Sequence, residues 1–285
     1  MNNNNMKVNC AGMRVLLRGP FPPPFGGIAT LLNSLIVGFK DSGAEDVVVL
    51  HYGTKNAVEK VEGATIYRYN LKTQIWKAFL PQNWALLFRV FTYLGKYGFS
   101  YRQLLRETTK AILAYEIASK HNSNVINFHQ SHEALESLVC MQKWGKSRSV
   151  VLTIYGEIYD NMDQIEPRPD LYKVMIERPA AVLASSEHCA RSFKKIGIDR
   201  PIEVVYVGVD MERFANNNIL RESYRKQLGT QENTVILLYM GRFEHEMGLD
   251  SMVEIVPSLI EKMGNDIKFI FAGAKGPLVE MALKC

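Results

Sequence analysis

The chain has 285 residues, of which 47% are hydrophobic and 22% are charged, a composition typical of a folded globular protein rather than a disordered one. A formal net charge of +5 is too small to indicate nucleic-acid binding by itself, but it favours acidic lipids or phosphate-bearing partners. The four cysteines form no CxxC pair and have no metal-ligand spacing. We therefore expect reduced thiols in a cytoplasmic protein.

Residues 1–12 are polar and low in complexity, with no apolar stretch before a cleavage site, so we predict a disordered tail and no secretory signal. Nowhere does the sequence hold an uncharged apolar run of about 20 residues, the length that a membrane-spanning helix requires. We expect a cytoplasmic protein, either free or peripheral at the inner face of the membrane.

From Met13 onward, short apolar runs alternate with longer amphipathic stretches. The expected strands, in chain order, are 14–18, 46–50, 124–128, 149–154, 181–184 and 202–206. The expected helices between them are 28–41, 101–120, 132–144 and 188–195. Apolar strands separated by helices indicate a parallel sheet covered on both faces. The sequence therefore predicts an α/β fold whose first domain, residues 13–214, is Rossmann-like and doubly wound.

A second βαβ unit is expected after the polar stretch 215–218, with a strand at 235–240, a helix at 248–262 and a strand at 267–272. From Asn218 to the end there are 68 residues (285 − 218 + 1 = 68). A doubly wound domain usually needs about 100 or more. We therefore expect residues 215–285 to form a partial C-terminal domain.

Four segments of the chain, in sequence order, resemble segments of the family-4 glycosyltransferases. In that family, two Rossmann-like domains face a cleft in the GT-B fold. The matching segments are the Pro-rich loop ending in Gly26-Gly27, the stretches 184–187 and 206–214 taken together, the loop 239–248, and the strand 269–273. The resemblance spans residues 13–283 and depends on order and spacing. It implies transfer of a sugar from a nucleotide-sugar co-substrate to an acceptor hydroxyl with retention of configuration, in cell-envelope or exopolysaccharide assembly. No metal or further cofactor is implied.

Gly26 and Gly27 stand at the turn from the first strand into the first helix. Backbone N–H groups at a helix N-terminus meet phosphate oxygens, and glycine lets a ligand approach closely. A tight turn without a ligand is the alternative. The loop from Gly19 to Gly26 holds four prolines and is not GxGxxG, so a dinucleotide cofactor is disfavoured.

Arg242 follows the first strand of the second domain, where a guanidinium can bind the donor diphosphate bidentately. The alternative is a surface arginine paired with Glu244 or Glu246. The resemblance implies a lysine just before Gly248, but Met247 stands there, and a thioether cannot neutralise a diphosphate.

Tyr155 ends another first-domain strand, at the place where the family commonly has a histidine near the reacting sugar. Its hydroxyl can donate a hydrogen bond to a sugar, and Glu157 is either an acid/base or acceptor ligand or a loop residue facing water. His129 and His132 either form a polar wall of the acceptor site or are loop histidines with satisfied hydrogen bonds.

The family's pair of donor-binding glutamates, eight positions apart, would fall beyond Cys285. We therefore expect weak catalysis or none from the 285-residue chain, and we leave the catalytic residue unassigned. The alternative function is a non-catalytic module that binds a sugar or a lipid-linked acceptor.

Residues 72–110 hold seven basic residues against one acid, Glu107, interleaved with nine aromatic residues. This composition is typical of interfacial helices on an anionic membrane surface. The alternative is that the aromatic residues form core and the charges face water. The same composition also suits single-stranded nucleic acid, but no binding motif supports that, so no nucleic-acid partner is expected.

Overall fold

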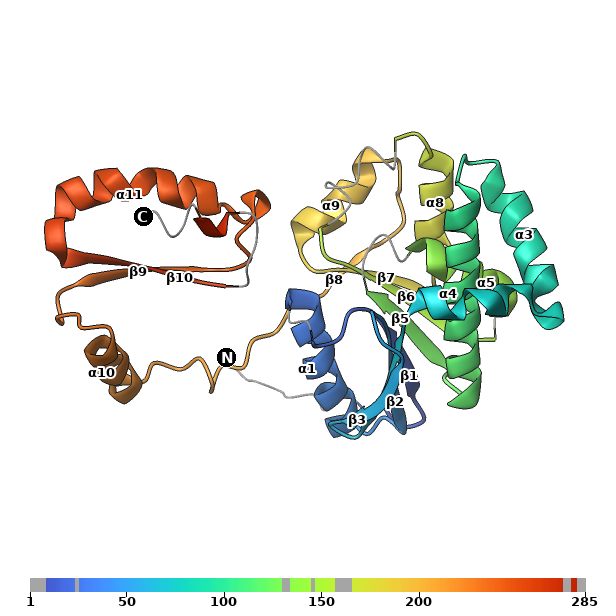
Figure 1. The fold of residues 1–285 in the computed structure, drawn as a ribbon. Coiled ribbons are helices and arrows are strands. Elements are labelled where there is room, and N and C mark those ends of the chain that lie inside the picture. Colours follow the sequence, from blue (N-terminus) through green and yellow to red (C-terminus); the bar gives the residue numbers. More distant parts are fainter. Residues whose placement is uncertain are drawn as a thin grey trace. The chain divides into compact units, whose positions relative to one another are not determined.

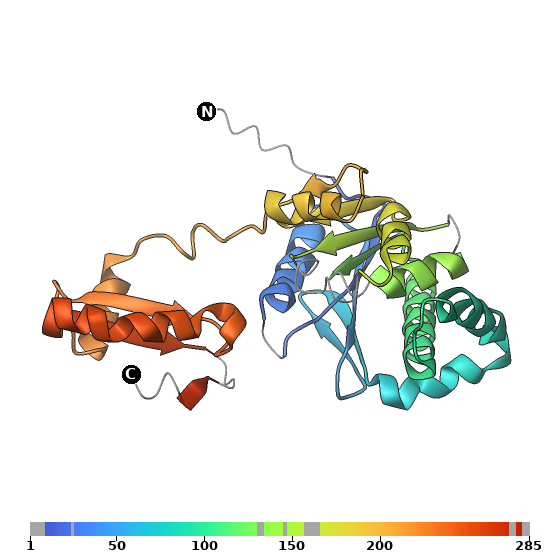
Figure 2. The same cartoon turned by 90° about the horizontal axis from the view of Figure 1, so that it is seen from above.

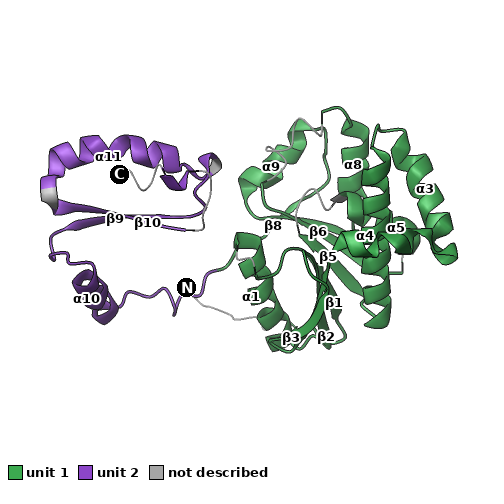
Figure 3. Cartoon of the chain, in the orientation of Figure 1, with its two compact units in different colours: residues 1–208 green, residues 209–285 purple. Residues whose placement is uncertain are grey.

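A computed structural model of the protein describes residues 9–23, 26–129, 134–144, 147–156, 166–273 and 278–280. The chain divides into two compact units, residues 1–208 and residues 209–285 (Figure 3). Each unit contains its own sheet.

Unit 1 is built on an eight-stranded sheet in the order β3-β4-β2-β1-β5-β6-β7-β8 (Figure 1). Every neighbouring pair is parallel except β3 and β4. This mixed, mostly parallel sheet confirms the predicted α/β class. The strands are β1 (Arg14–Arg18), β2 (Asp46–Tyr52), β3 (Ala57–Val61), β4 (Ala64–Tyr69), β5 (Val125–His129), β6 (Ser149–Ile154), β7 (Ala181–Ala184) and β8 (Glu203–Val204).

Alternate residues of each strand point to opposite faces of this sheet. Both faces carry apolar residues, and helices cover both. On one face, Val15 and Leu17 of β1 pack in a cluster with Leu32 and Ile36 of α1. Leu16, on the other face, belongs to the cluster of the helical layer that contains α4 and α5. In both views the blue helix α1 lies on one side of the sheet and the cyan-to-green helices lie on the other (Figure 1, Figure 2). The helices are α1 (Gly27–Asp41), α2 (Leu71–Gln74), α3 (Trp84–Gly95), α4 (Tyr101–Lys120), α5 (Ala134–Trp144), α8 (Pro169–Glu177) and α9 (Glu187–Lys195), with 3-10 helices η1 (Ile75–Phe79) and η2 (Pro81–Asn83).

The antiparallel hairpin β3–β4 was not among the strands expected from the sequence. Four of the five β3 residues are exposed, so the strand is no apolar run. Its turn uses Glu62 and Gly63, both with positive φ (47° and 74°). The hairpin closes one edge of the sheet with an exposed strand that carries charges, which discourages pairing with another chain.

Unit 2 contains two parallel strands, paired from Ile267 with Val235 to Ala272 with Met240. Its buried cluster is formed by Tyr239, Leu249 and Leu278. Unit 2 consists of α10 (Asn218–Gln227), β9 (Val235–Met240), η4 (His245–Met247), α11 (Leu249–Met263), η5 (Gly264–Asp266) and β10 (Ile267–Ala272). In neither unit does a described helix combine the length and hydropathy needed to cross a membrane.

Candidate functional site

The winding of the unit 1 sheet reverses beside β1. From β1 the chain passes through α1 to β2 on one side, and it later returns through α4 to β5 on the other side. In open α/β sheets, ligands bind at such a switch point, in the crevice outside the carboxyl ends of the strands. The loop that contains Gly26 and Gly27 and the end of β5 both lie at this point.

The N-terminus of α1 is open. Gly26 is the N-cap, with extended backbone (φ −176°, ψ 165°), and no side chain caps the helix. The first turn of α1 holds no acidic residue. A Cβ placed on Gly26 or Gly27 would meet nothing within 4 Å, so neither packing nor positive φ requires glycine at these positions. Among the residues that the structure describes, no side chain caps these N–H groups, and the absent glycine side chains leave room for an anion.

Arg68 of β4 holds the loop that leads from β1 to this N-terminus. Its guanidinium donates to the carbonyl oxygens of Phe21 (3.0 Å), Pro23 (3.2 Å) and Pro22. His51 Nδ1 accepts a hydrogen bond from the Phe21 N–H at 3.3 Å. Burial lowers the pKa of His51 to about 4, with further lowering by the charges of Arg68 and Arg18, so this ring is neutral near pH 7. The loop is therefore fixed by β2 and β4, although nothing in the sequence of the loop indicates these partners.

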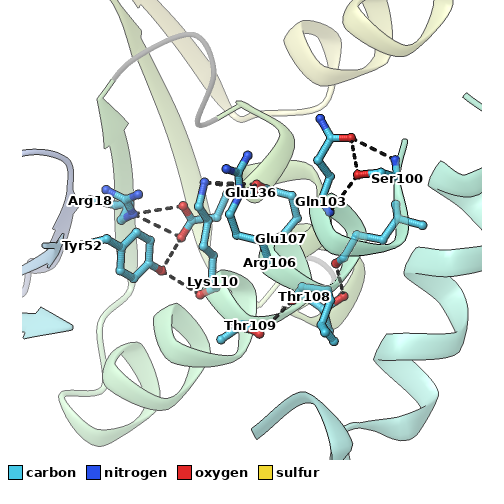
Figure 4. Close-up of polar contacts among 12 residues, drawn as sticks. Arg18, Tyr52, Ser100, Gln103, Arg106, Glu107, Thr108, Thr109, Lys110 and Glu136 are labelled. Atoms are coloured by element: carbon cyan, nitrogen blue, oxygen red, sulfur yellow. Dashed lines mark hydrogen bonds and ion pairs between the residues drawn. The ribbon is translucent and has the colours of Figure 1, made fainter. Parts of the chain in front are cut away.

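A buried ion pair joins the carboxyl end of β1 to α5 (Figure 4). Arg18, the last residue of β1, places Nε 3.0 Å from Glu136 Oε2 of α5, and both side chains are almost fully buried. The Tyr52 hydroxyl lies 2.9 Å from Glu136 Oε1 and from the Lys110 carbonyl oxygen, and its ring is stacked 3.9 Å beneath the Arg18 guanidinium. These contacts orient both charges. Sequence reasoning missed this pair, whose members are 118 residues apart; the only signal was a charged residue ending an apolar strand.

His129 and Tyr155 are paired at the ends of β5 and β6. The Tyr155 hydroxyl lies 2.7 Å from His129 Nδ1, and the two rings are stacked with centroids 6.0 Å apart. His129 is the last residue of β5 and is 1% exposed, so it is a buried strand residue and not the loop histidine expected. Burial, with the charge of Arg18, lowers its pKa to about 3. His129 Nε2 is buried and has no hydrogen-bond partner in the described part of the chain.

In unit 2, Arg242 follows β9 at the carboxyl end of the two parallel strands. Its Nη1 lies 2.8 Å from Glu244 Oε2, and its side chain is 55% exposed. The Tyr239 hydroxyl donates to the Arg242 carbonyl oxygen at 2.6 Å and fixes the backbone of this loop. Met247 is the last residue of η4 and is also exposed. The guanidinium is thus paired with a carboxylate while remaining accessible to a ligand.

The structure gathers the candidate residues of unit 1 at one sheet edge: Gly26 and Gly27 open α1, and Tyr155 pairs with His129. Arg242 belongs to unit 2. Glu157 and His132 lie outside the described residues. No cluster of three or more His, Cys, Asp or Glu side chains suited to a metal ion occurs among residues that the structure describes.

A doubly wound first unit followed by a second βαβ unit is the arrangement of a GT-B fold. Residues 25–213 match Glycosyltransferase Family 4, and the chain belongs to this family. Residues 221–285 match Glycosyl transferases group 1. No curated protein matches the chain.

Several solved structures share the fold. An α,α-trehalose-phosphate synthase (UDP-forming) from Burkholderia xenovorans, in complex with glucose-6-phosphate, has a TM-score of 0.62 at 13% identity, covering 96% of this chain and 69% of that chain. Sucrose-phosphate synthase from Thermosynechococcus elongatus gives 0.60 at 14% identity, with 91% and 70% covered. Anabaena Alr3699/HepE, in complex with UDP and glucose, gives 0.58 at 14% identity, with 95% and 64% covered. The chain therefore spans about two thirds of the length of these proteins.

Proposed function

We propose that the chain acts in the transfer of a sugar from a nucleotide-sugar donor to an acceptor hydroxyl, with retention of configuration. The observation that carries the proposal is the uncapped α1 N-terminus after β1, at the same carboxyl end of the parallel strands as the paired His129 and Tyr155. UDP and glucose occupy one protein of the same fold, and glucose-6-phosphate another, which supports a nucleotide-sugar donor and a sugar acceptor.

Each candidate residue then has a role. The N–H groups at Gly26 and Gly27 bind a phosphate oxygen. Tyr155 hydrogen-bonds a sugar hydroxyl, its own hydroxyl being positioned by His129. Glu157 contributes a carboxylate to the acceptor or to proton transfer.

Arg242 binds the donor diphosphate and stabilises the negative charge that develops on the leaving nucleotide as the sugar bond breaks. Since Glu244 occupies this guanidinium in the structure, donor binding exchanges one anion for another. The thioether of Met247 adds no charge to this loop.

The acceptor is a glycan or a lipid-linked sugar, in cell-envelope or exopolysaccharide assembly. The basic and aromatic composition of residues 72–110 supports a protein that works at the anionic inner face of the membrane.

Calorimetric titration of the purified chain with UDP, GDP and UDP-glucose tests the donor site. We expect submillimolar binding of one diphosphate, weakened about tenfold or more by Arg242→Gln, because a charge-assisted bond contributes about 1.5–3 kcal/mol. The matched variant Glu244→Gln should strengthen binding, because it removes the competing carboxylate. Absence of binding by a chain that still melts cooperatively would overturn the donor assignment. Binding without sugar transfer to any acceptor would favour the alternative, a non-catalytic module that binds a sugar or a lipid-linked acceptor.

A further inference from the structure

Four large aromatic side chains on neighbouring elements of unit 1 are exposed to solvent. Trp76 and Phe79 of η1 are 56% and 48% exposed, and Trp84 and Phe88 of α3 are 60% and 71% exposed. An exposed apolar group of this size is unusual unless the surface contacts another molecule.

These four residues form a continuous surface, which we name the aromatic strip. Trp76 and Phe79 are three apart in a 3-10 helix, so they lie on the same side of it. The Trp84 indole N–H donates to the Phe79 carbonyl oxygen at 2.7 Å, which joins α3 to η1. Trp84 and Phe88 are four apart on α3 and are therefore neighbours on its surface.

The aromatic strip is not part of the hydrophobic core. On α3 the residues that contact the core are Leu86, Val90 and Leu94. Four other aromatic residues of the segment 72–110 are partly buried and pack against the same core: Phe91, Tyr93, Tyr97 and Phe99. Tyr101, the ninth aromatic residue of the segment, is 59% exposed and makes an edge-to-face contact with Phe91. Both sequence-based interpretations therefore hold for part of the segment: four aromatic residues pack against the core, and the strip is exposed to a partner.

The surroundings of the strip are positively charged. Residues 71–106 contain six basic residues and no Asp or Glu. Lys77 pairs with Glu116 at 2.6 Å, whereas Lys72 and Arg89 are exposed. A partner for this surface must therefore provide both an apolar region into which the rings can insert and negative charge beside it.

We infer that the aromatic strip inserts into the headgroup region of an anionic lipid bilayer, with Lys72 and Arg89 contacting lipid phosphates. The inference rests on the proposed membrane association and names the face that makes it. Tryptophan is favoured at such interfaces because its ring is apolar and its N–H is polar. A second copy of the chain fits the strip less well, because a two-fold symmetric contact would bring the basic residues of both copies together.

Co-sedimentation of the full chain with vesicles tests this inference. We expect binding to phosphatidylcholine vesicles that contain phosphatidylglycerol, at least about tenfold stronger than to phosphatidylcholine alone, and a decline as salt rises. Lys72→Gln and Arg89→Gln should each weaken binding about fivefold, since a basic residue near such a surface contributes about 1 kcal/mol. Equal binding to both vesicle types, or none to either, would overturn the inference.

The variant Trp84→Ser/Phe88→Ser should lose binding, while Tyr206→Ala, at a 65% exposed tyrosine outside the segment, should keep it. Because both substituted positions are exposed, the variant should still unfold cooperatively, with a melting temperature lowered only slightly by the loss of the Trp84–Phe79 hydrogen bond. On vesicles, the emission of Trp76 and Trp84 should shift to the blue, and that of Trp144, which is 6% exposed, should not.

The competing occupant, a second copy of the chain, is tested by ultracentrifugation. If the chain dimerises, the strip variant abolishes the dimer and no lipid binding is seen, the strip belongs to a second copy. Diphosphate binding is measured in solution without vesicles. A failure of the membrane inference can therefore be distinguished from a failure of the proposed donor binding.

Discussion

The two units build parallel strands from similar apolar sequences but bury them very differently. In unit 1, the five central residues of β2 are buried, because helices cover both faces of the sheet and strands flank both edges of β2. In unit 2, every residue of β10 is only partly buried, and Leu238 and Met240 of β9 are 56% and 79% exposed. The comparison shows that an apolar run specifies a strand, whereas burial of that strand depends on what covers it.

The same contrast holds for the ion pairs at the carboxyl ends of the strands. Arg18 and Glu136 are 4% and 0% exposed, whereas Arg242 and Glu244 are 55% and 29% exposed. A buried pair keeps its partners, because separating the two groups would leave an unpaired charge in the protein interior, away from water. A half-exposed pair is weak and can exchange partners. Four pairs of substitutions, each with one member in unit 1 and one in unit 2, test this difference between the units.

The largest expected effect comes from Arg18→Met. It removes the Arg18 guanidinium from the buried Glu136 carboxylate and should lower the free energy of unfolding of unit 1 by about 3–5 kcal/mol. The matched change in unit 2, Arg242→Met, should alter stability by about 1 kcal/mol or less. Urea unfolding followed by far-UV circular dichroism gives both values. The double variant Arg18→Met/Glu136→Leu should recover most of the loss, and a loss equal to that of the single variant would contradict the charge argument.

Next in size is truncation of a core leucine. Leu113→Ala in α4 should destabilise unit 1 by about 2–5 kcal/mol, because it leaves a cavity at a fully buried position. Leu249→Ala in α11 should destabilise unit 2 alone. All three tryptophans lie in unit 1, so tryptophan fluorescence reports that unit and circular dichroism reports both. If Leu249→Ala shifted the fluorescence transition as much as Leu113→Ala does, the two units would unfold as one.

A smaller effect should appear with pH. The pKa of His129 is about 3 in the fold and about 6.5 when unfolded, so below pH 6.5 the unfolded chain binds a proton that the folded chain does not. The contribution of neutral His129 to the free energy of unfolding is therefore complete above pH 6.5. It falls by up to about 1.4 kcal/mol per pH unit as the pH drops toward 3. His129→Asn should flatten this slope in fluorescence-detected urea unfolding between pH 6 and 4. The matched variant His245→Asn lies in unit 2, which has no tryptophan, and should leave this fluorescence-detected slope unchanged.

The smallest effect concerns helix caps. Ser100 caps α4 in a reciprocal pair of hydrogen bonds with Gln103, and Asn217 caps α10 by accepting from the Leu220 N–H. Ser100→Ala should lower the stability of unit 1 by about 1 kcal/mol in fluorescence-detected unfolding. Asn217→Ala should not move that transition, since α10 buries no residue and belongs to unit 2. An equal shift from both variants would argue for coupling between the units.

How much the sequence predicts depends on how local the determining contacts are. The apolar runs of β1, β5 and β9 locate these strands within one residue, because a continuous run of apolar residues is a local property. The hairpin β3–β4 was missed because its outer strand is exposed. The places of Gly26 and Gly27 at the start of α1 and of Tyr155 directly after β6 follow from the local sequence, while their proposed roles stay predictions. The partners Glu136 and Arg68 do not, because only the assembled sheet brings them beside β1 and the loop after it.

Gly241 and Gly273 follow β9 and β10 and lie against each other, which restricts how the proposed donor-binding loop of unit 2 can vary. A Cβ at Gly273 would lie 1.7 Å from the carbonyl oxygen of Gly241, so no other residue fits position 273 without moving the backbone. Between Gly241 and the left-handed Gly248 (φ 70°), the exposed positions 242 and 247 and the partly buried position 244 carry no such restriction. Variants selected for a new donor should therefore accumulate changes at those three positions and retain glycine at 273.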